Sequence, residues 1–160
     1  MDQAAFTEKM QAYGQTLYRT ARSMLRSDDD CQDALQEAVL KAWAGRDRLR
    51  EERFFCTWLT RIVINECRNI QRRKARMPLS NQLDHAADIA VPEGNGIMAL
   101  VDALPEKQRL AVALHYVQGM PIAEAARILR VPQSTVRGRL FEARKALRLE
   151  LTQEEEARAK

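Results

Sequence analysis

Residues 121–147 read PIAEAARILRVPQSTVRGRLFEARKAL, and this stretch decides the fold of the C-terminal part of the chain. Its apolar residues recur at steps of three and four, which is the period of one face of an α-helix. They form two sets, Ile122, Ala125, Ala126 and Leu129, then Val136, Leu140, Ala143 and Leu147. Arg130-Val131-Pro132 separates the two sets with a turn. The stretch therefore predicts a helix-turn-helix, in which small alanines let the second helix approach closely.

The second of these helices begins with residues that suit contact with DNA. Gln133, Ser134 and Thr135 can cap the helix and donate to phosphates or bases, and Arg137 can pair with guanine or a phosphate. The other interpretation is an ordinary helical hairpin with a solvated cationic face. Because a turn, small residues and a basic helix coincide here, the sequence favours a helix that enters the major groove.

The N-terminal part of the chain is also predicted to be helical. One apolar face runs from Phe6 to Leu25, and the triplet Asp28-Asp29-Asp30 then ends that helix and offers N-caps for the next one. The second helix ends at Gly45, and a charged loop follows at 46–52.

A third helix is expected from about Phe54 to Arg76, and its polar residues form a stripe. These residues are spaced four, three, four and four apart, which places them on one face: Arg61, Asn65, Arg68, Arg72 and Arg76. The apolar residues Leu59, Ile62, Val63 and Ile70 are expected on the opposite side. Arginine suits phosphate oxygens, and an interposed amide can hydrogen-bond an exposed base. The alternative is a solvated helix face, but the stripe has no acidic residue of its own to support it.

Aromatic residues cluster at the start of this helix, at Phe54, Phe55 and Trp58. Aromatic rings beside a cationic groove can stack unpaired bases. We expect Trp58 and one of the two phenylalanines to belong to the core instead. The charged loop at 46–52 carries three arginines and three acidic residues, and it could shape a pocket for a flipped base.

Between the helical parts, the stretch 77–95 has a different character. It contains two prolines, no lysine or arginine, and three acidic residues, Asp84, Asp88 and Glu93. Because a long stretch without helical periodicity fits poorly inside a compact domain, we interpret it as a flexible acidic linker.

The fold class predicted from these patterns is all-α, with two small helical domains joined by the linker. The domains are expected at 1–76 and 96–153. The last helix is expected to run from about Gln133 to Leu151, and 154–160 to form a fraying charged tail.

Composition limits the classes of function. The chain has a formal net charge of +4, which suits a polyanionic partner when the basic residues line one face. The N-terminus is polar, and no apolar run approaches the roughly 20 residues that cross a bilayer, so we expect no membrane insertion and a cytoplasmic protein. The three cysteines, Cys31, Cys56 and Cys67, form no CxxC pair. They are interpreted as free thiols, and neither a metal site nor a cofactor is expected.

Three stretches together resemble extracytoplasmic-function (ECF) sigma factors of bacterial RNA polymerase, over nearly the whole chain. Residues 28–43, DDDCQDALQEAVLKAW, look like the family's clamp-binding helix D-A-E-D-x-x-Q-E-x-F-x-x-x-W. Residues 54–76, FFCTWLTRIVINECRNIQRRKAR, are similar to its promoter helix W-L-x-x-I-A-x-N-x-x-x-D-x-x-R-R-x-x-R. Residues 103–148 look like the family's L-P-x-x-x-R…EIA-x-x-L…TV-x-S-R-x-x-R-A-R-x-x-L. Ordered matches on both sides of an acidic linker are far more specific than either alone.

The resemblance implies a non-catalytic polymerase subunit that confers promoter choice and helps to melt DNA. Asp33, Gln36 and Glu37 match family residues that contact the β′ clamp helices of core RNA polymerase. The third helix would hold the melted non-template strand of the −10 element, and its expected contacts are Arg61, Asn65, Arg68, Arg72 and Arg73.

For the C-terminal domain, the resemblance implies reading of the −35 element as a duplex and docking on the β flap. The expected duplex contacts are Gln133, Ser134, Thr135, Arg137, Gly138, Phe141 and Glu142. The linker would follow the RNA exit path, where its carboxylates resemble an RNA backbone. An anti-sigma partner is also implied, because such factors are usually held inactive by one.

The chain departs from the family pattern at several positions. Cys31-Gln32 replaces the usual Ala-Glu, Gly138 stands where serine is common, and Glu142 where arginine is common. A glycine inside a helix costs ~1 kcal/mol relative to alanine, so Gly138 suggests close approach to DNA. Glu142 would repel phosphate but can accept from a cytosine amino group. We therefore expect a −35 preference different from that of better-known members.

Two other functions compete with this interpretation. A stand-alone helix-turn-helix regulator would explain the C-terminal half but would leave the Asp33 helix and the arginine stripe unused. An enzyme, such as a nuclease using scattered carboxylates, is a rival of another class. However, His85 and His115 have no evident partners in the sequence, and no metal-ligand spacing or phosphate-binding loop occurs.

Overall fold

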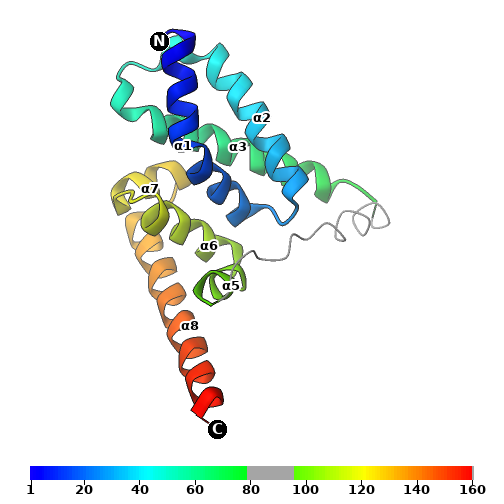
Figure 1. Ribbon diagram of the computed structural model, residues 1–160, viewed down its shortest axis with the longest axis vertical. Coiled ribbons are helices and arrows are strands. Elements are labelled where there is room, and N and C mark those ends of the chain that lie inside the picture. The colour runs from blue at the N-terminus through cyan, green and yellow to red at the C-terminus, as the bar shows by residue number, and fades with distance from the viewer. Residues whose placement is uncertain (79–95, 160) are drawn as a thin grey trace. The chain divides into compact units, whose positions relative to one another are not determined.

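The computed structural model describes residues 1–78 and 96–159, and the chain divides into two compact units, Met1–Ala90 and Val91–Lys160 (Figure 1). Neither described range contains a β-strand, and the helices confirm the predicted all-α class with two helical domains. Of the predicted linker, 79–95 lies outside the described residues. None of the described helices is long and apolar enough to cross a membrane.

The first unit is built from three long helices, α1 (Gln3–Met24), α2 (Asp28–Ala44) and α3 (Phe55–Ala75), each packed against the other two. Asp2 caps α1, and its carboxylate accepts from the Ala5 amide at 2.8 Å. The N-cap of α2 is Ser27, not a member of the aspartate triplet as expected. Ser27 has the extended backbone that an N-cap requires, so the three aspartates occupy the first turn, where they stabilise the positive end of the helix dipole.

The core of this unit lies where the three helices face one another. Small side chains of α2, Ala34, Ala38 and Ala42, are fully buried and let α3 approach closely. Larger side chains fill the remaining space, among them Leu17, Phe55, Leu59, Val63 and Ile64. Phe6 meets the ring of Phe55 edge-on, with centroids 5.7 Å apart. Phe54 is exposed, so one phenylalanine of the pair is core as expected, whereas Trp58 is only half-buried.

The charged segment between α2 and α3 forms two short 3₁₀ turns, η1 (Arg46–Arg48) and η2 (Glu52–Phe54). Arg46 donates to the Trp43 carbonyl at 2.8 Å, and its guanidinium lies 4.0 Å from the centroid of the Trp43 ring. Lys9 of α1 forms an ion pair with Glu52 at 3.7 Å. These contacts hold both ends of the segment against the helices.

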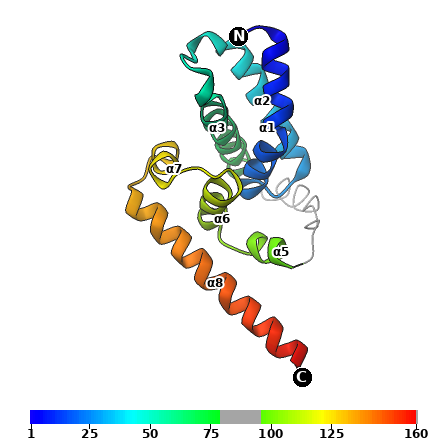
Figure 2. The same ribbon diagram turned by 60° about the vertical axis from the view of Figure 1, so that its left-hand side comes forward.

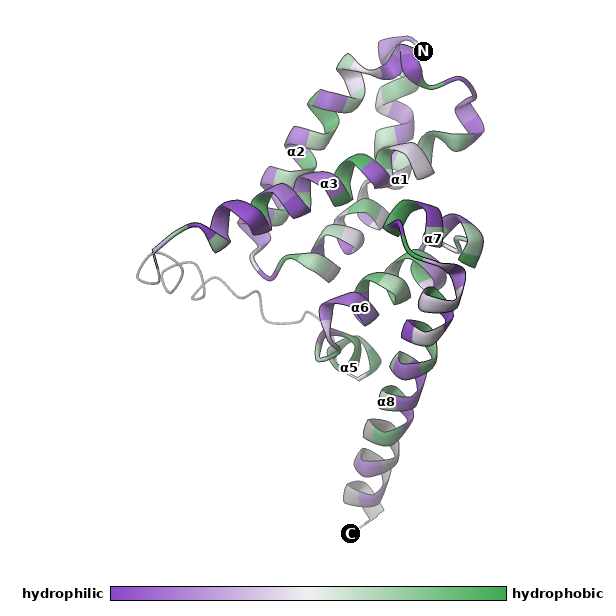
Figure 3. Ribbon diagram, turned by 180° about the vertical axis from the view of Figure 1, so that it is seen from behind, coloured by the Kyte–Doolittle hydropathy of each residue, from purple (hydrophilic) through white to green (hydrophobic). Residues whose placement is uncertain are grey.

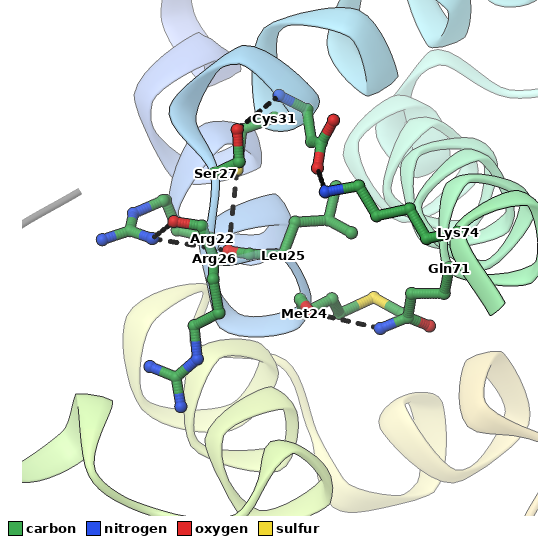
Figure 4. A network of polar contacts seen from close by, with 9 residues as sticks. Arg22, Met24, Leu25, Arg26, Ser27, Cys31, Gln71 and Lys74 are labelled. Carbon is green, nitrogen blue, oxygen red and sulfur yellow. Dashed lines mark hydrogen bonds and ion pairs between the residues drawn. The ribbon is translucent and has the colours of Figure 1, made fainter. Parts of the chain in front are cut away.

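A polar network joins the corner between α1 and α2 to the last turns of α3 (Figure 4). Gln71 donates to the Met24 carbonyl at 3.1 Å, and Lys74 forms an ion pair with Asp30. On the other side of the corner, Arg22 donates to the Arg26 carbonyl at 2.9 Å. The C-terminal end of α3 is therefore attached to the rest of the unit by polar contacts as well as by its apolar face.

The second unit consists of α5 (Ile97–Asp102), α6 (Glu106–Val112), a π-helical turn η3 (Ala113–Val117), α7 (Ile122–Leu129) and α8 (Gln133–Ala159) (Figure 2). α8 packs against α5, α6 and α7. Buried residues from these helices form its core: Leu104, Leu110, Leu114, Ala125, Ala126, Leu129, Val136, Leu140 and Ala143. The predicted helix-turn-helix is therefore present, with both alanines of α7 buried as expected.

Two details of this unit depend on backbone geometry. Arg109 is buried and donates to the Leu104 carbonyl, which fixes the turn between α5 and α6. Arg130 ends α7 in the left-handed conformation with φ of 57°, an uncommon geometry for a residue other than glycine. This conformation reverses the chain toward Pro132 and the start of α8.

The end of α8 was predicted wrongly. The helix does not end near Leu151 with a fraying tail but continues to Ala159. No glycine or proline occurs in 152–159, and glutamate, glutamine, alanine and arginine all have high helix propensity. The charged character that suggested a tail is thus equally compatible with a solvated helix.

Candidate nucleic-acid interface

The predicted polar stripe lies on one face of α3. Arg61, Asn65, Arg72 and Arg76 are exposed, and Arg68 is half-buried. The opposite face carries buried Leu59, Val63 and Ile70, so the same helix packs on one side and presents cations on the other. Hydrophilic residues dominate the C-terminal part of α3 in Figure 3. Within the described ranges, none of the four stripe arginines forms an ion pair with a carboxylate.

Beside this stripe, the ends of α2 and η1 form a hollow with α3, called here the Asn65 hollow, with a volume of about 430 Å³. Its lining residues are Lys41, Ala44, Gly45, Arg48, Trp58, Ile62, Asn65 and Glu66. Ile62 was expected on the packed face with Leu59, but it is half-buried and contributes to the wall of this hollow. The half-buried Trp58 contributes another, aromatic part of the wall.

Two of the lining residues of the hollow, Lys41 and Glu66, form an ion pair. Lys41 Nζ is 2.5 Å from Glu66 Oε1, and Glu66 is only 7% exposed. Asn69 donates to the other carboxylate oxygen of Glu66 at 3.5 Å, and Lys41 also lies 3.9 Å from Glu37. The hydrogen bond to Glu66 raises the pKa of Lys41 above its ordinary value, so the amine stays charged. The helical period of α3 gives no sign of this pair, because Lys41 lies on another helix, 25 residues earlier in the sequence.

A second concave surface, called here the α2–α3 groove, runs along the other side of Glu66 and has a volume of about 590 Å³. Its lining residues are Asp33, Ala34, Gln36, Glu37, Leu40, Glu66, Asn69, Ile70 and Arg73. The three predicted polymerase contacts, Asp33, Gln36 and Glu37, are therefore brought together and are all exposed.

Arg73 lies in this groove and not in line with the other predicted strand contacts. It follows Arg72 by one residue, a rotation of ~100° around the helix. That rotation carries Arg73 away from the stripe and toward α2, beside the acidic residues of the groove. The structure thus separates Arg73 from Arg61, Asn65 and Arg72.

In the second unit, the start of α8 presents the predicted duplex contacts. Gln133, Ser134, Arg137, Gly138, Phe141 and Glu142 are exposed, and Thr135 is half-buried. Val136, Leu140 and Ala143 hold the opposite face of the helix in the core. Phe141 is 56% exposed, which is unusual for a large apolar side chain, and Gly138 has no atom within 4 Å of the position that a Cβ would take. Packing within the unit therefore does not require glycine at position 138.

No group of three histidine, cysteine, aspartate or glutamate side chains that could hold a metal ion occurs among the residues that the structure describes. All three cysteines are free thiols. Burial raises the pKa of the Cys31 thiol to about 12, so this side chain is neutral at physiological pH.

Comparison with known proteins agrees with this division into two units. Residues 10–77 match the family model of sigma-70 region 2, and residues 95–147 match that of sigma-70, region 4. The ECF RNA polymerase sigma factor SigM of Mycobacterium tuberculosis is 34% identical over 151 residues, which cover 91% of this chain and 76% of that protein. The ECF RNA polymerase sigma-E factor of Escherichia coli is 31% identical over 137 residues, 74% of this chain and 72% of that protein.

Two solved structures are similar to this chain in fold. CnrH, in complex with the cytosolic domain of CnrY, is similar with a TM-score of 0.67 and 27% identity, over 94% of this chain and 90% of that one. The sigma factor RpoE of Bartonella quintana, in complex with the anti-sigma factor NepR, is similar in fold with a TM-score of 0.74 and 23% identity. That likeness covers 92% of this chain and 97% of the RpoE chain.

Two helical units that match regions 2 and 4 define the class as a sigma-70-type transcription factor. Within that class, the chain belongs to the ECF RNA polymerase sigma factors. It therefore acts in promoter recognition and transcription initiation, which confirms the function expected from the resemblance. Membership of the sigma factors also implies that the chain is a specificity subunit of RNA polymerase, without catalytic activity of its own.

Proposed function

We propose that the two units divide promoter recognition between melted and duplex DNA. The observation that carries this proposal is the α3 stripe, where Arg61, Arg72 and Arg76 are exposed and not paired with carboxylates of the described residues. Guanidinium groups with free donors suit the phosphates of a DNA strand. Asn65, on the same face, borders a hollow lined by the aromatic side chain of Trp58, and aromatic side chains stack unpaired bases. The stripe and hollow therefore suit the opened non-template strand of the −10 element.

The Asn65 hollow supports this division because it has the parts that hold an unstacked base. Trp58 and Ile62 supply apolar walls, and Asn65 and Arg48 supply hydrogen-bonding groups. Extruded bases are read by such groups on their Watson–Crick edge, with stacking on aromatic or apolar side chains. η1 contains both Arg46 and Arg48. The contacts of Arg46 to the carbonyl and ring of Trp43 therefore hold the turn that positions Arg48 in this wall.

In the second unit, α8 would read the −35 element in the major groove. Exposed polar residues at the start of the helix, Gln133, Ser134 and Arg137, suit phosphate and base-edge contacts. Phe141 and Glu142 lie on the exposed side of the same helix. An aromatic ring can contact a thymine methyl group, and a carboxylate can accept from cytosine N4. Gly138, Phe141 and Glu142 are therefore the residues that would distinguish the −35 preference of this chain.

The α2–α3 groove is the proposed contact with the β′ clamp helices of core polymerase. Asp33, Gln36 and Glu37 line it together with the exposed apolar side chain of Leu40. A polar rim beside an apolar anchor is typical of protein interfaces. Because Arg73 lies in this groove, we propose that it contributes to polymerase binding, in place of the strand contact that the resemblance implied.

Other partners are proposed from the family alone. CnrH and RpoE were solved with CnrY and the anti-sigma factor NepR respectively, and we propose that an anti-sigma factor likewise binds this chain. We also propose docking of the second unit on the β flap and action in the cytoplasm. The predicted path of the linker through the RNA exit region falls on residues outside those described.

Run-off transcription with purified core polymerase on a promoter library tests the proposed function. We expect promoter-specific transcripts that depend on the full chain, together with capture of core polymerase by the tagged chain. DNA binding without core binding would instead indicate a stand-alone helix-turn-helix regulator. Absence of both promoter-specific transcripts and core binding would overturn the proposed function.

A further inference from the structure

Glu66 is shared by the two concave surfaces of the first unit. It lines the Asn65 hollow on one side and the α2–α3 groove on the other. Its neighbour Asn65 is exposed and belongs to the stripe, whereas Glu66 is 7% exposed. A buried carboxylate beside a surface that would receive a polyanionic strand has an electrostatic cost, so its presence at this position calls for an explanation.

We propose that Glu66 is a specificity-determining residue, whose carboxylate accepts a hydrogen bond from the exocyclic amine of a base held in the Asn65 hollow. This inference rests on the proposed function, in which the hollow receives an unstacked base of the non-template strand. It predicts that the hollow accepts adenine, cytosine or guanine and excludes thymine. The reason is chemical, because thymine is the one DNA base without an exocyclic amine.

The surroundings of Glu66 leave it able to accept this bond. A carboxylate has about four lone-pair sites, whereas Lys41 occupies one at Oε1 and Asn69 one at Oε2. The positive charge of Lys41, 2.5 Å away, offsets the negative charge that would otherwise repel the DNA strand. The pair thereby provides a fixed acceptor without a net negative charge at the hollow.

Thymine would form less favourable hydrogen bonds with the Glu66 carboxylate than the other three bases. Its single ring N–H lies between two carbonyl oxygens, so if the Glu66 carboxylate accepts from that N–H, a carbonyl oxygen is brought against the carboxylate on either side. Two acceptors in contact have no proton to share, and the carboxylate cannot be rehydrated in a filled hollow. Glutamine at the same position would have nearly the same shape, but its amide NH₂ could donate to a thymine carbonyl.

The test uses holoenzyme assembled from the full chain and core polymerase, on a promoter library randomised through the −10 region. Transcripts are sequenced for the wild-type chain, Glu66→Gln and Glu66→Ala. With wild type, we expect one non-template position at which thymine is depleted about five-fold or more, the lower end of the discrimination given by a good base contact. With either variant, thymine at that position should return to within about two-fold of the other bases.

Asp47→Asn is the matched control. Asp47 is an exposed acidic residue of the adjacent turn η1 that does not line the hollow, so the variant removes one nearby negative charge without removing the acceptor. It should retain the thymine depletion of the wild type. If Asp47→Asn abolishes the depletion to the same extent as Glu66→Gln, general electrostatics is the cause and the inference is wrong.

The outcomes separate this inference from the proposed function. If the wild-type holoenzyme selects promoters but the base profiles of both Glu66 variants match its own, Glu66 has only a structural role and the inference fails. Lower transcript yield with an unchanged base profile leads to the same conclusion. If the wild-type holoenzyme selects no promoter at all, the proposed function fails, and this inference fails with it.

Discussion

The side-chain amide of Gln71 donates to the backbone carbonyl of Met24 at 3.1 Å, across 47 residues of sequence. This bond joins the last turns of α3 to the end of α1. The ion pair between Lys74 and Asp30 joins the same turns to the start of α2. Arg68, Arg72 and Arg76 lie on this part of α3, so the orientation of the cationic stripe depends on contacts made on the other side of the helix.

Gln71→Ala should therefore destabilise the first unit. Loss of the amide leaves the Met24 carbonyl without its donor, and we expect the free energy of unfolding to fall by about 1–3 kcal/mol. Urea denaturation followed by tryptophan fluorescence measures this unit selectively, because Trp43 and Trp58 are the two tryptophans of the chain and both lie in it. Gln11→Ala, at an exposed position of α1, is the control and should change stability by less than about 0.5 kcal/mol.

Arg72→Ala and Arg137→Ala should impair different steps of initiation. Loss of Arg72 removes a strand contact, so permanganate footprinting should show fewer open complexes, while −35 duplex binding is retained. Loss of Arg137 should weaken binding of the −35 duplex by roughly 5- to 150-fold, the 1–3 kcal/mol of a base-reading arginine. Equal losses of duplex binding by both variants, with no separate effect on melting, would contradict the division between the two units.

Glu37→Lys should weaken binding to core polymerase by roughly tenfold or more, a change of about 1.4 kcal/mol. The substitution reverses a charge on the rim of the α2–α3 groove and also removes an acidic neighbour of Lys41. Core affinity can be measured by competition with a labelled sigma factor. Glu8→Lys, an exposed charge reversal on α1, is the control and should bind core as the wild type does.

Arg73→Ala distinguishes the groove from the stripe. Because Arg73 lines the α2–α3 groove, we expect it to lower core affinity, as Glu37→Lys does, and to leave open-complex formation unchanged once core is saturated. Arg72→Ala is the adjacent comparison and should show the reverse pattern. A melting defect of Arg73→Ala at saturating core would instead support the strand contact that the family resemblance implied.

Alkaline pH should destabilise the first unit. Burial is the main cause that raises the pKa of the Cys31 thiol from 9.0 to about 12, and burial together with Asp28 raises that of the Tyr18 hydroxyl from 10.0 to about 12. Both groups are neutral in the folded state and ionise more readily when unfolded. Their contribution to stability is therefore complete below pH 9 and is lost as the pH rises from about 9 to 12. Urea denaturation at stepped pH values would show this decline, whereas a constant free energy of unfolding over that range would contradict it.

Much of the fold was predictable because its signals are local. The apolar steps of three and four residues between Phe6 and Leu25, and again in α7 and α8, report helix faces without knowledge of any partner. The exposed and buried sides of α3 follow from the same period, so Arg61, Asn65 and Arg72 were placed correctly on one surface. Ser27 as the cap of α2 and the extension of α8 to Ala159 were missed, because helix ends depend on one or two residues with weak preferences.

The sequence by itself determined the helices, their two-unit division and the polar stripe of α3, since each depends on the spacing of residues close together in the chain. Only the tertiary structure decided which surface each side chain joins. The packing of α2 on α3 pairs Lys41 with Glu66, 25 residues later, and turns Arg73 toward Asp33 and away from Arg72. Such relationships depend on the rotation of one helix against another, which is set by the packing of buried side chains such as Ala38 and Val63 and not by the period of either helix alone.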